Sequence, residues 1–534
     1  MDLNHFSLIY PTPESKTAHE SGKMRPDVDA FTLEELGLSE VFSIKSGDLS
    51  DFLTIDPAVM EYRRATFSDM LACPELAGMF SRLTPVLEDI KELRRLEADS
   101  GSEDDYLSSL TEIELYISCI ELLHEGLSSA KDRLSSPAFK ELENLVCELS
   151  ESDYYKNLNK RLAELTSRVR EIRSVTVGVN LDARLEPTSA GVLSVNAEPF
   201  KSGDALDKIL RLNFKNDPYT CIANLVPFSK GQSENEKTAL SLAFHNAIGQ
   251  VYRSSLHSWK KIVQEYVLEN TEFLLTLSPE FEFLAKGRDF LQKLIDRGLP
   301  LSVPTLCPME KVAFAAKGLY NPVVALKTDD AIVPSDLVFD EAARIYVLTG
   351  PNRGGKSVIT CAAGLAAVMM QLGMPVPASE ATISPVDGIY THFPTGADDT
   401  IDKGRLGEEC ARLGEIFDAI TPESLVLLDE SLSSTGSFEA SYIASEVLLG
   451  LSKVGCRTIF STHLHELAAK VPELNERSKE EGGYAIDTLV AGVEEGGHRS
   501  FRIKRAKPDG KSYAGDIAKR YGLTYEEIQK RIQK

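Results

Sequence analysis

The sequence predicts a mostly α-helical region with a small β insertion, followed by an α/β domain built on a parallel sheet. From about residue 57 to 173, apolar residues recur every three or four positions, which predicts amphipathic helices. Over residues 175–181, valines and a leucine alternate with polar residues or glycine, which predicts a strand. Between about residues 309 and 470, short apolar runs alternate with helical patterns. This alternation is typical of a parallel sheet with crossover helices.

Length and composition limit the classes of protein to which the chain could belong. Its 534 residues suffice for about three or four domains, and 43% hydrophobic and 26% charged residues are ordinary for a globular protein. No apolar run approaches the roughly 20 residues that span a bilayer, and residues 1–15 lack the features of a signal peptide. The eight cysteines occur singly, so neither a zinc site nor a disulfide framework is predicted. We expect a cytoplasmic protein with no membrane segment.

The charge of the chain argues against nucleic-acid binding by overall attraction, because the formal net charge is −23. Local basic stretches remain. Residues 156–173 carry six basic side chains, namely Lys156, Lys160, Arg161, Arg168, Arg170 and Arg173. Residues 499–534 are also basic. On charge alone, a solvated helix face is the simpler interpretation of either stretch, and a nucleic-acid contact is the alternative.

Changes of pattern along the chain predict where its parts begin and end. The sequence Thr32–Glu35 has the form of a capping box and predicts the start of a short helix. A turn-like segment, Glu186–Gly191, separates the strand at 175–181 from a second predicted strand, Val192–Asn196. We expect an N-terminal segment, partly mobile, over 1–56; a helical domain over 57–300 with its β insertion near 174–200; an α/β domain over 309–497; and a C-terminal element over 498–534.

The most specific motif is Gly-x-x-x-x-Gly-Lys-Ser, formed by Gly350, Gly355, Lys356 and Ser357. An apolar strand pattern precedes it and a helical apolar run, Val358–Leu372, follows it, which is the context of a phosphate-binding loop rather than of a chance glycine turn. The glycines allow backbone N–H groups to face phosphates, and the helix N-terminus adds partial positive charge. Lys356 is expected to reach the β- and γ-phosphates of ATP, and Ser357 to bind Mg²⁺. The residues expected to bind the nucleotide here are Gly350, Pro351, Asn352, Arg353, Gly354, Gly355, Lys356, Ser357 and Val358.

Two further strand patterns end in side chains that suit ATP hydrolysis. The first begins at Ser424 and ends in two carboxylates: Asp429 is expected to bind Mg²⁺, directly or through water, and Glu430 to polarise the attacking water. The second ends at His463, which is placed to sense the γ-phosphate. A lone histidine at a strand end is usually structural, and we assign His465 that role, but the position of His463 after the carboxylate pair favours function. The predicted catalytic residues are Lys356, Glu430 and His463.

The segments around these motifs extend the pattern. They are Thr349–Ser357, Gly373–Ala378, Ile383–Thr391, Asp429–Gly436, Phe460–Leu467 and Gly510–Ile528. Together they resemble the ATPase domain and the C-terminal helix-turn-helix of the DNA mismatch repair protein MutS family. The resemblance implies an ABC/MutS-type P-loop NTPase domain that hydrolyses ATP with Mg²⁺. It also implies a homodimer braced by the C-terminal element, with DNA and repair proteins as partners. The helical region is similar in layout to the family's lever and clamp domains.

The chain also departs from the family pattern. The segment Gly404–Glu409 reads Gly-Arg-Leu-Gly-Glu-Glu where the family carries Gly-Arg-Ser-Thr-Phe, so the hydroxyl that would contact the opposite γ-phosphate is missing. Glu408 or Glu409 would repel a phosphate unless it is turned away or paired. Arg353 stands where methionine is usual, and the adenine-stacking aromatic falls at Ile332, so apolar packing is expected to replace stacking. We expect a short MutS-like ATPase without the family's mismatch-recognition and connector domains.

The expected function is that of a MutS-like ATPase whose ATP binding and hydrolysis drive a dimeric clamp on DNA. The expected role is DNA mismatch repair or a related repair or recombination process, without direct reading of mismatches. A transporter's energy-coupling subunit would need a Leu-Ser-Gly-Gly-Gln-like signature, and the sequence has none. Two alternatives stay open: an ATPase that acts on structured RNA or ribosomes, and a non-catalytic scaffold that nucleotide locks.

Overall fold

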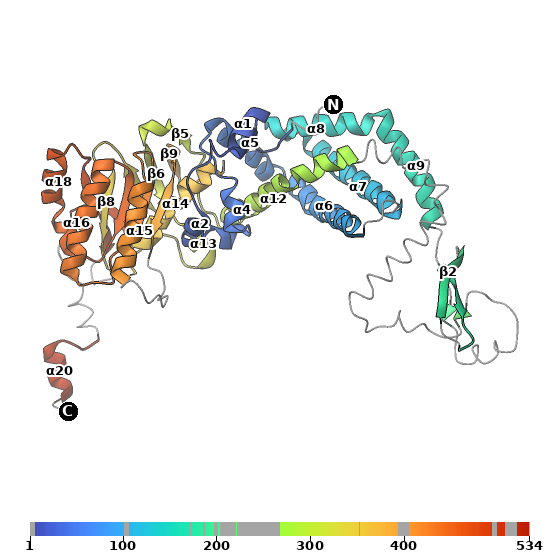
Figure 1. Ribbon diagram of the computed structural model, residues 1–534. Helices are drawn as coiled ribbons and strands as arrows, with labels where there is room; N and C mark the ends of the chain where they lie inside the picture. The colour runs from blue at the N-terminus through green and yellow to red at the C-terminus, as the bar shows by residue number, and fades with distance from the viewer. Residues whose placement is uncertain are drawn as a thin grey trace. The chain divides into compact units, whose positions relative to one another are not determined.

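The structure is a computed structural model that divides into two compact units (Figure 1). Unit 1 includes Cys73–Leu134 and Phe139–Glu282, and unit 2 includes His5–Ala72, Ser135–Ala138 and Phe283–Lys534. These bounds differ from the expected division at residues 57 and 300. The residues described are 6–100, 106–170, 174–184, 187–196, 201–202, 220–221, 268–351, 353–393, 405–493, 499–507 and 521–532.

Unit 1 is mainly helical, as the periodicity predicts. Its helices pack through aromatic residues: the ring centroid of Phe80 lies 6.1 Å from that of Phe139 and 5.2 Å from that of Phe281. At one end, Arg94 forms ion pairs with the buried Glu112 at 2.9 Å and with Glu272 at 2.5 Å. The helices of this unit are α6 (Pro74–Ser100), α7 (Tyr106–Ala130), α8 (Pro137–Glu151), α9 (Asp153–Arg170) and α12 (Leu268–Asp296). The first two residues of α8 belong to unit 2, and α12 continues into unit 2.

The β insertion is an antiparallel hairpin of β1 (Ser174–Leu181) and β2 (Pro187–Asn196). The first strand is confirmed, but the expected turn over 186–191 is wrong because pairing of Leu181 with Pro187 moves the turn to the preceding residues. There Asp182 Oδ1 accepts a hydrogen bond from the Arg184 backbone N–H at 2.8 Å, a typical aspartate turn. Short strands β3 (Lys201–Ser202) and β4 (Thr220–Cys221) pair with each other. Within the helical domain expected to extend to residue 300, residues 222–267 lie outside the described residues.

The larger sheet of unit 2 has six strands in the order β10-β11-β12-β8-β13-β14. Five of them run parallel, which confirms the expected parallel core, and β14 adds an antiparallel edge to β13. Strands β8, β11 and β12 are buried at every position, as expected for strands covered on both faces. The strands are β8 (Ile345–Thr349), β10 (Ile389–His392), β11 (Leu425–Asp429), β12 (Arg457–Ser461), β13 (Ile486–Val493) and β14 (Arg499–Arg505).

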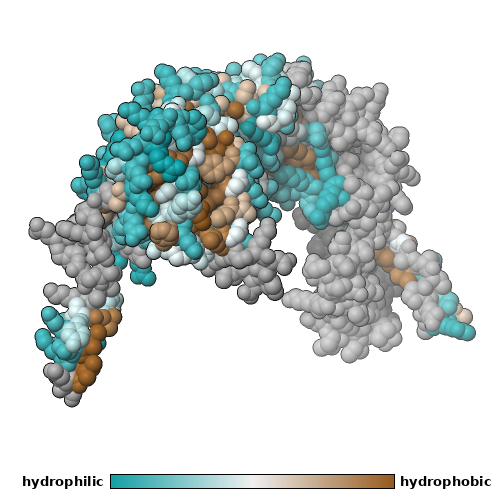
Figure 2. Space-filling view, turned by 60° about the vertical axis from the view of Figure 1, so that its left-hand side comes forward, coloured by the Kyte–Doolittle hydropathy of each residue, from teal (hydrophilic) through white to brown (hydrophobic). Residues whose placement is uncertain are grey.

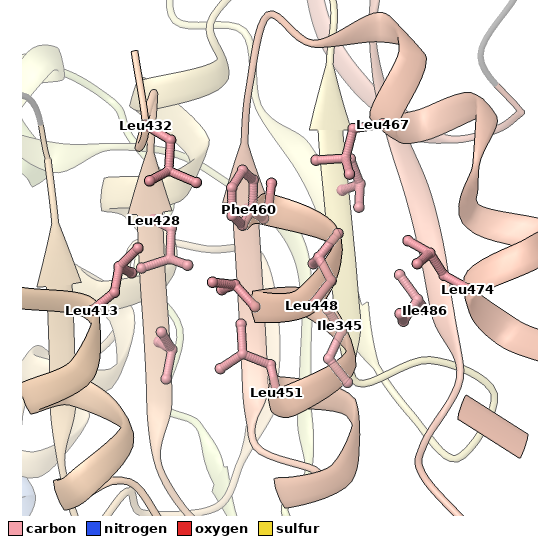
Figure 3. Packing of buried hydrophobic residues seen from close by; sticks show 14 of the residues in the cluster. Ile345, Leu413, Leu428, Leu432, Leu448, Leu451, Phe460, Leu467, Leu474 and Ile486 are labelled. Atoms are coloured by element: carbon pink, nitrogen blue, oxygen red, sulfur yellow. The ribbon is translucent and has the colours of Figure 1, made fainter. Parts of the chain in front are cut away.

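Helices lie on both faces of this sheet (Figure 1). Helix α14 (Lys356–Gln371) contacts β11 and β12 and also strand β6 of a second, four-stranded sheet. The opposite face carries α15 (Arg405–Ala419), α16 (Ser437–Val454), α17 (His465–Ala469) and α18 (Val471–Glu480). There Ile345 and Phe460 of the sheet pack with Leu448 and Leu451 of α16 in one apolar core (Figure 3). The second sheet has the order β5-β9-β6-β7, with β5 (Thr305–Leu306), β6 (Phe314–Leu319), β7 (Ser335–Phe339) and β9 (Glu380–Ile383); α13 (Pro322–Lys327) joins β6 to β7.

The N-terminal segment belongs to the core of unit 2 from residue 6 onward, a role that the sequence analysis did not find. Leu33 and Leu36 are buried, as are Phe42 and Leu49. The expected capping box at Thr32 is wrong, because the helix begins two residues earlier and Asp29 is its N-cap, accepting the Thr32 N–H at 2.7 Å. The helices are α1 (Pro13–Glu20), α2 (Ala30–Leu36), α3 (Leu38–Phe42), α4 (Ser46–Ser50) and α5 (Pro57–Ala72).

The C-terminal element is described only in part. Residues 508–520 of the expected helix-turn-helix lie outside the described residues, and α20 (Tyr525–Ile532) is its described helix. Tyr521, Leu523, Tyr525 and Ile532 are exposed, and apolar side chains gather along one side of this segment (Figure 2). In the described part of the chain, no helix has the length and apolar character needed to cross a bilayer.

Candidate functional site: a phosphate-binding loop beside two carboxylates

The predicted phosphate-binding loop connects β8 to α14 at the carboxyl end of the parallel sheet. Two of its glycines are required by the backbone. Gly350 has φ +145°, and a Cβ there would lie 2.5 Å from the Cβ of Ala491. Gly355, with φ +91°, is the N-cap of α14. Arg353 adopts φ +59°, a conformation uncommon for a side-chain-bearing residue. The loop therefore holds an unusual backbone at the helix N-terminus, where anions bind; Asn352 lies outside the described residues.

Lys356 is the first residue of α14, and its side chain folds back over the loop. The residue is only 4% exposed, and its Nζ donates to the carbonyl oxygens of Gly350 at 3.1 Å and Pro351 at 3.3 Å. Burial lowers the pKa of the ammonium group, and the carboxylates of Glu430 and Asp429 act in the opposite direction. A buried cation whose hydrogen bonds go to neutral acceptors suits the binding of an anionic group.

Glu430 and His463, two of the predicted catalytic residues, are in contact. His463 Nε2 lies 2.5 Å from Glu430 Oε1, and His463 Nδ1 lies 3.4 Å from Lys356 Nζ. Because an ammonium group can only donate, Nδ1 is assigned as the acceptor and Nε2–H as the donor to the carboxylate. The three predicted catalytic side chains thus form a continuous line from the loop to the end of the neighbouring strand.

The backbone after β11 is strained where these side chains meet. Glu430 has φ +50° and Leu432 has φ +66°, both in the left-handed region that residues other than glycine seldom occupy. The Glu430 N–H donates to the Ser461 carbonyl at 2.9 Å and so ties this turn to β12. Strain of this kind persists where surrounding structure imposes it, and it is concentrated at functional sites.

Asp429 is the predicted Mg²⁺ ligand at the end of β11. It is 6% exposed, and its Oδ1 has no hydrogen-bond partner among the described residues. Burial raises the pKa of its carboxyl group, and the nearby hydroxyls of Ser357 and Ser461 lower it. No group of three or more His, Cys, Asp or Glu side chains able to hold a metal occurs in the described part of the chain. One carboxylate and one hydroxyl nevertheless fit Mg²⁺, which is usually held by few protein ligands together with substrate phosphates and water.

The altered signature segment is tied to the same site. Glu409, near the start of α15, accepts a hydrogen bond at 2.8 Å from Ser434 Oγ in the loop that follows Glu430, so this carboxylate is paired. His392, at the end of β10, lies 2.8 Å from Ser431 Oγ. Burial, followed by the charge of Arg412, lowers the pKa of His392 to about 4. Gly404 lies outside the described residues.

Ile332, expected beside the base, is half-buried just before β7. A pocket of about 580 Å³ lies nearby and begins two residues further on, at Pro334. The sequence analysis missed Phe501, which is 47% exposed, has φ +54° and approaches Gly355. An aromatic residue within the basic run Arg499–Arg505 is the signal in the sequence that could have indicated it. The pocket is lined by Gly318, Pro334, Ser335, Asp336, Val338, Asp340, Tyr346, Leu489, Arg502, Ile503, Lys504 and Arg505.

Two family models match the chain. Residues 346–493, which contain the loop, the carboxylate pair and His463, match "MutS domain V", and residues 55–297 match the "MutS2 N-terminal domain". MutS domain V is a P-loop ATPase domain, so the class of protein that this fold and site define is a P-loop ATPase type of nucleotide-binding protein.

Curated relatives point to the same family. The DNA mismatch repair protein MutS of Prochlorococcus marinus (strain MIT 9301) is 33% identical over 233 residues, which is 43% of this chain and 25% of the relative. That of Caldicellulosiruptor bescii is 35% identical over 209 residues, 38% of this chain and 23% of the relative. That of Symbiobacterium thermophilum is 38% identical over 156 residues, 28% of this chain and 18% of the relative. The matched segments thus span a quarter or less of these relatives, and with the two family models they confirm the resemblance of this chain to the MutS family.

Proposed function

We propose that the protein is a cytoplasmic, homodimeric MutS-like ATPase whose ATP binding and hydrolysis drive a clamp on DNA. The proposed role is mismatch repair or a related repair or recombination process, without direct reading of mismatches. The observation that carries the proposal is the line of side chains Lys356–His463–Glu430 beside the buried carboxylate of Asp429. It combines a cation for phosphate, a base and a metal ligand within one strained edge of the sheet.

The chemistry follows from the groups at this edge. The ammonium group of Lys356 would exchange its bonds to two loop carbonyls for bonds to the β- and γ-phosphates. Ser357 and the unpartnered Oδ1 of Asp429 would hold Mg²⁺, which offsets the negative charge of the phosphates when bound. Glu430 would orient the attacking water and accept its proton. His463, bonded to Glu430, would then report the presence of the γ-phosphate to the carboxylate.

Exposed apolar residues support a dimer that closes over the nucleotide. Phe438 is 82% exposed and Tyr442 is 64% exposed, one turn apart at the start of α16, which follows the loop from Glu430 to Gly436. The apolar side of α20 is a second uncovered surface. We propose that the C-terminal element braces the partner's ATPase domain, so a chain truncated before Lys511 should be monomeric with depressed ATPase activity. A truncated chain that stays dimeric and loses only DNA affinity would instead assign this element to DNA binding.

Contact with nucleic acid is proposed through the basic stretch at residues 156–173. Lys156 and Lys160 are exposed on α9, and the side chains of Arg161, Arg168, Arg170 and Arg173 lie outside the described residues. Contacts to phosphates carry no base information. Affinity should therefore fall steeply with salt, with a log–log slope of about −0.9 for each contact. Mismatched and matched duplexes should bind within about threefold, which corresponds to less than about 1 kcal/mol.

Phosphate release from ATP and Mg²⁺ tests the proposal. It should be measured without nucleic acid and with matched duplex, mismatched duplex, four-way junction or structured RNA at two salt concentrations. We expect hydrolysis that DNA changes and that Glu430→Gln abolishes, while Glu446→Gln, which removes an exposed carboxylate on α16, leaves it intact. A response to RNA alone would favour the ribosome or RNA alternative, and nucleotide binding without hydrolysis would favour the scaffold. A tenfold preference for the mismatch would contradict the proposed absence of mismatch reading.

A further inference from the structure

Helix α2, in the N-terminal segment, contacts three elements that surround the nucleotide site. On α14, a Cβ at Gly364 would lie 2.8 Å from Leu36 Cδ2, so the two helices approach closely where the glycine leaves room. At the end of β10, Thr391 Oγ1 donates to Thr32 Oγ1 at 3.4 Å. The third contact is with α15, through Arg412. Residues 6–54 lie outside both segments matched by the family models, so neither match explains these contacts.

The contact with α15 is the strongest of the three. Arg412 Nη2 lies 3.1 Å from each carboxylate oxygen of Glu35, and it donates to the Thr391 carbonyl at 3.0 Å. The guanidinium carbon lies 4.7 Å from the centroid of the Phe31 ring. Glu35 is 11% exposed and Arg412 is 26% exposed at the side chain, so water screens this pair less than it screens a surface ion pair. Arg412 is therefore held by charge, by a carbonyl and by an aromatic face together.

The preceding turn of α15 contacts the loop that follows Glu430. Glu409 precedes Arg412 by three residues, on the neighbouring turn of the helix, and accepts the hydrogen bond from Ser434 in the loop that follows Glu430. His392, which follows Thr391, lies beside Ser431 in that loop. Any movement of the loop on nucleotide binding or hydrolysis would therefore displace α15 and the end of β10, and both of these contact α2.

On its other side, α2 is joined to the helical region through α3, α4 and α5. The Thr54 N–H donates to the Gln371 carbonyl at the end of α14, at 3.2 Å, which fixes the chain just before α5. Near the end of α5, the buried carboxylate of Asp69 accepts the backbone N–H groups of Ser135 at 3.0 Å and Ser136 at 2.8 Å. The chain then continues into α6 of unit 1. The contacts of α2 with the nucleotide site are non-covalent, and the chain that runs from α2 through α5 connects them to the helical region.

We propose that Glu35 and Arg412 are positioning residues that hold α15 against α2, and that this ion pair couples the nucleotide state to the helical region. The inference rests on the proposed function, because it assigns the N-terminal segment a part in regulating that same ATPase site. Glu35 touches neither the loop nor the carboxylate pair. Its loss should spare nucleotide binding and break the link between nucleotide and nucleic acid.

The test compares Glu35→Gln with Glu40→Gln, a control that removes an ion pair with Lys327 at the neighbouring helix α3. A third protein carries the exchanged pair Glu35→Arg and Arg412→Glu, which restores opposite charges. We expect Glu35→Gln to leave KM for ATP and basal kcat within about twofold and to reduce stimulation of kcat by DNA at least about fivefold, the lower end of usual coupling energies. The control should behave as wild type, and the exchanged pair should recover most of the stimulation.

Hydrogen exchange of α2 and α15 gives a readout that needs no turnover. With Mg²⁺ and a non-hydrolysable ATP analogue, both helices of the wild type should change protection together, whereas in Glu35→Gln only α15 should respond. The proposed coupling is refuted if the protection of α2 changes equally in both proteins, or if Glu35→Gln keeps the stimulation of kcat by DNA. If the wild type binds the analogue but hydrolyses no ATP, the proposed function fails while the exchange experiment still decides the coupling.

Discussion

The two ends of the paired strands β11 and β12 differ in how their buried charged side chains are hydrogen-bonded. At the carboxyl end, Asp429 Oδ1 has no hydrogen-bond partner among the described residues, and Lys356 is bonded to loop carbonyls and a histidine. At the amino end, Arg457 is fully buried, and its Nη1 and Nη2 donate to carbonyl oxygens from three separate segments, at Ala313, at Ser384 and Pro385, and at Glu423.

Neighbouring polar groups extend this contrast. At the amino end, the Asp387 carboxylate accepts hydrogen bonds from Ser424 at 2.7 Å and from Thr421. At the carboxyl end, Glu430 carries a strained backbone. Buried polar groups in proteins are normally satisfied, so each unsatisfied group requires an explanation. Among the described residues Arg457 Nε also has no partner, but the other two nitrogens of this guanidinium group make four hydrogen bonds to carbonyl oxygens. We infer that the carboxyl end is arranged for a ligand and that the amino end holds the sheet together.

The largest expected effect is loss of ATP binding in Lys356→Ala, because the phosphates lose their nearest cation. We expect the Kd for ATP to rise by about 1,000-fold, or about 4 kcal/mol. Equilibrium titration with a fluorescent ATP analogue measures this change. Lys453→Ala, which removes an exposed lysine of α16, is the control and should bind normally. A rise of less than tenfold in the Kd of Lys356→Ala would mean that this lysine is structural.

At the other end of the strands, Arg457→Met should destabilise the protein without a specific effect on nucleotide. The change leaves several buried carbonyl oxygens without donors, for which we expect a loss of about 3 kcal/mol in the free energy of unfolding. Chemical denaturation of unit 2, followed by circular dichroism, measures it. At a temperature where the variant remains folded, its Kd for ATP should match that of the wild type. A stable variant that fails to bind ATP would reverse the roles of the two ends.

The smallest expected effect has the opposite sign: Asp429→Asn should stabilise the nucleotide-free protein. Burial raises the folded-state pKa of Asp429 above its unfolded value. Above that unfolded value, which is about 3.9, the unfolded chain carries the charge freely, so the carboxylate lowers stability at neutral pH. We expect a gain of about 1 kcal/mol, or roughly 2 °C in Tm at pH 7. The gain should vanish as the pH falls below the unfolded-state pKa of about 3.9, where the carboxyl group is protonated in both states.

With Mg²⁺ and ATP present, the wild type should become more stable than Asp429→Asn, because ligands stabilise a protein only in proportion to their binding. The Tm of the wild type should rise on their addition, and the Tm of Asp429→Asn should not. A lower Tm for the variant without ligands would show that the carboxylate is already compensated, which would remove the contrast between the two strand ends.

The site was predictable from sequence because its chemistry is local. Gly350, Gly355 and Lys356 stand at fixed spacing, and the strand patterns that lead to Asp429 and His463 end at one edge when their sheet is parallel. The structure brings these side chains together through the parallel register of β8, β11 and β12. The parallel core and the helical region were predicted for the same reason, since both depend on periodic patterns of apolar residues.

The role of the N-terminal segment could not be predicted from sequence, because it depends on contacts across the chain. Helices α2, α3 and α4 have seven, five and five residues, too few for a periodic pattern to show. The partner of Glu35 is 377 positions away, at Arg412. The exact start of α2 was missed because Asp29 and Thr32 are both good N-cap residues, and only the structure shows which one accepts the hydrogen bond.

The account is tested most directly by Glu430→Gln, which keeps the size of the side chain and its ability to accept from His463 but removes the base. Kd for ATP and the rate of phosphate release should be measured on the same preparation. We expect the Kd to stay within about threefold. Phosphate release should fall by at least about 100-fold, and the ATP-bound variant should accumulate as a closed dimer, visible by light scattering. Hydrolysis at the wild-type rate would contradict the central claim that Glu430 activates the water at this edge of the sheet.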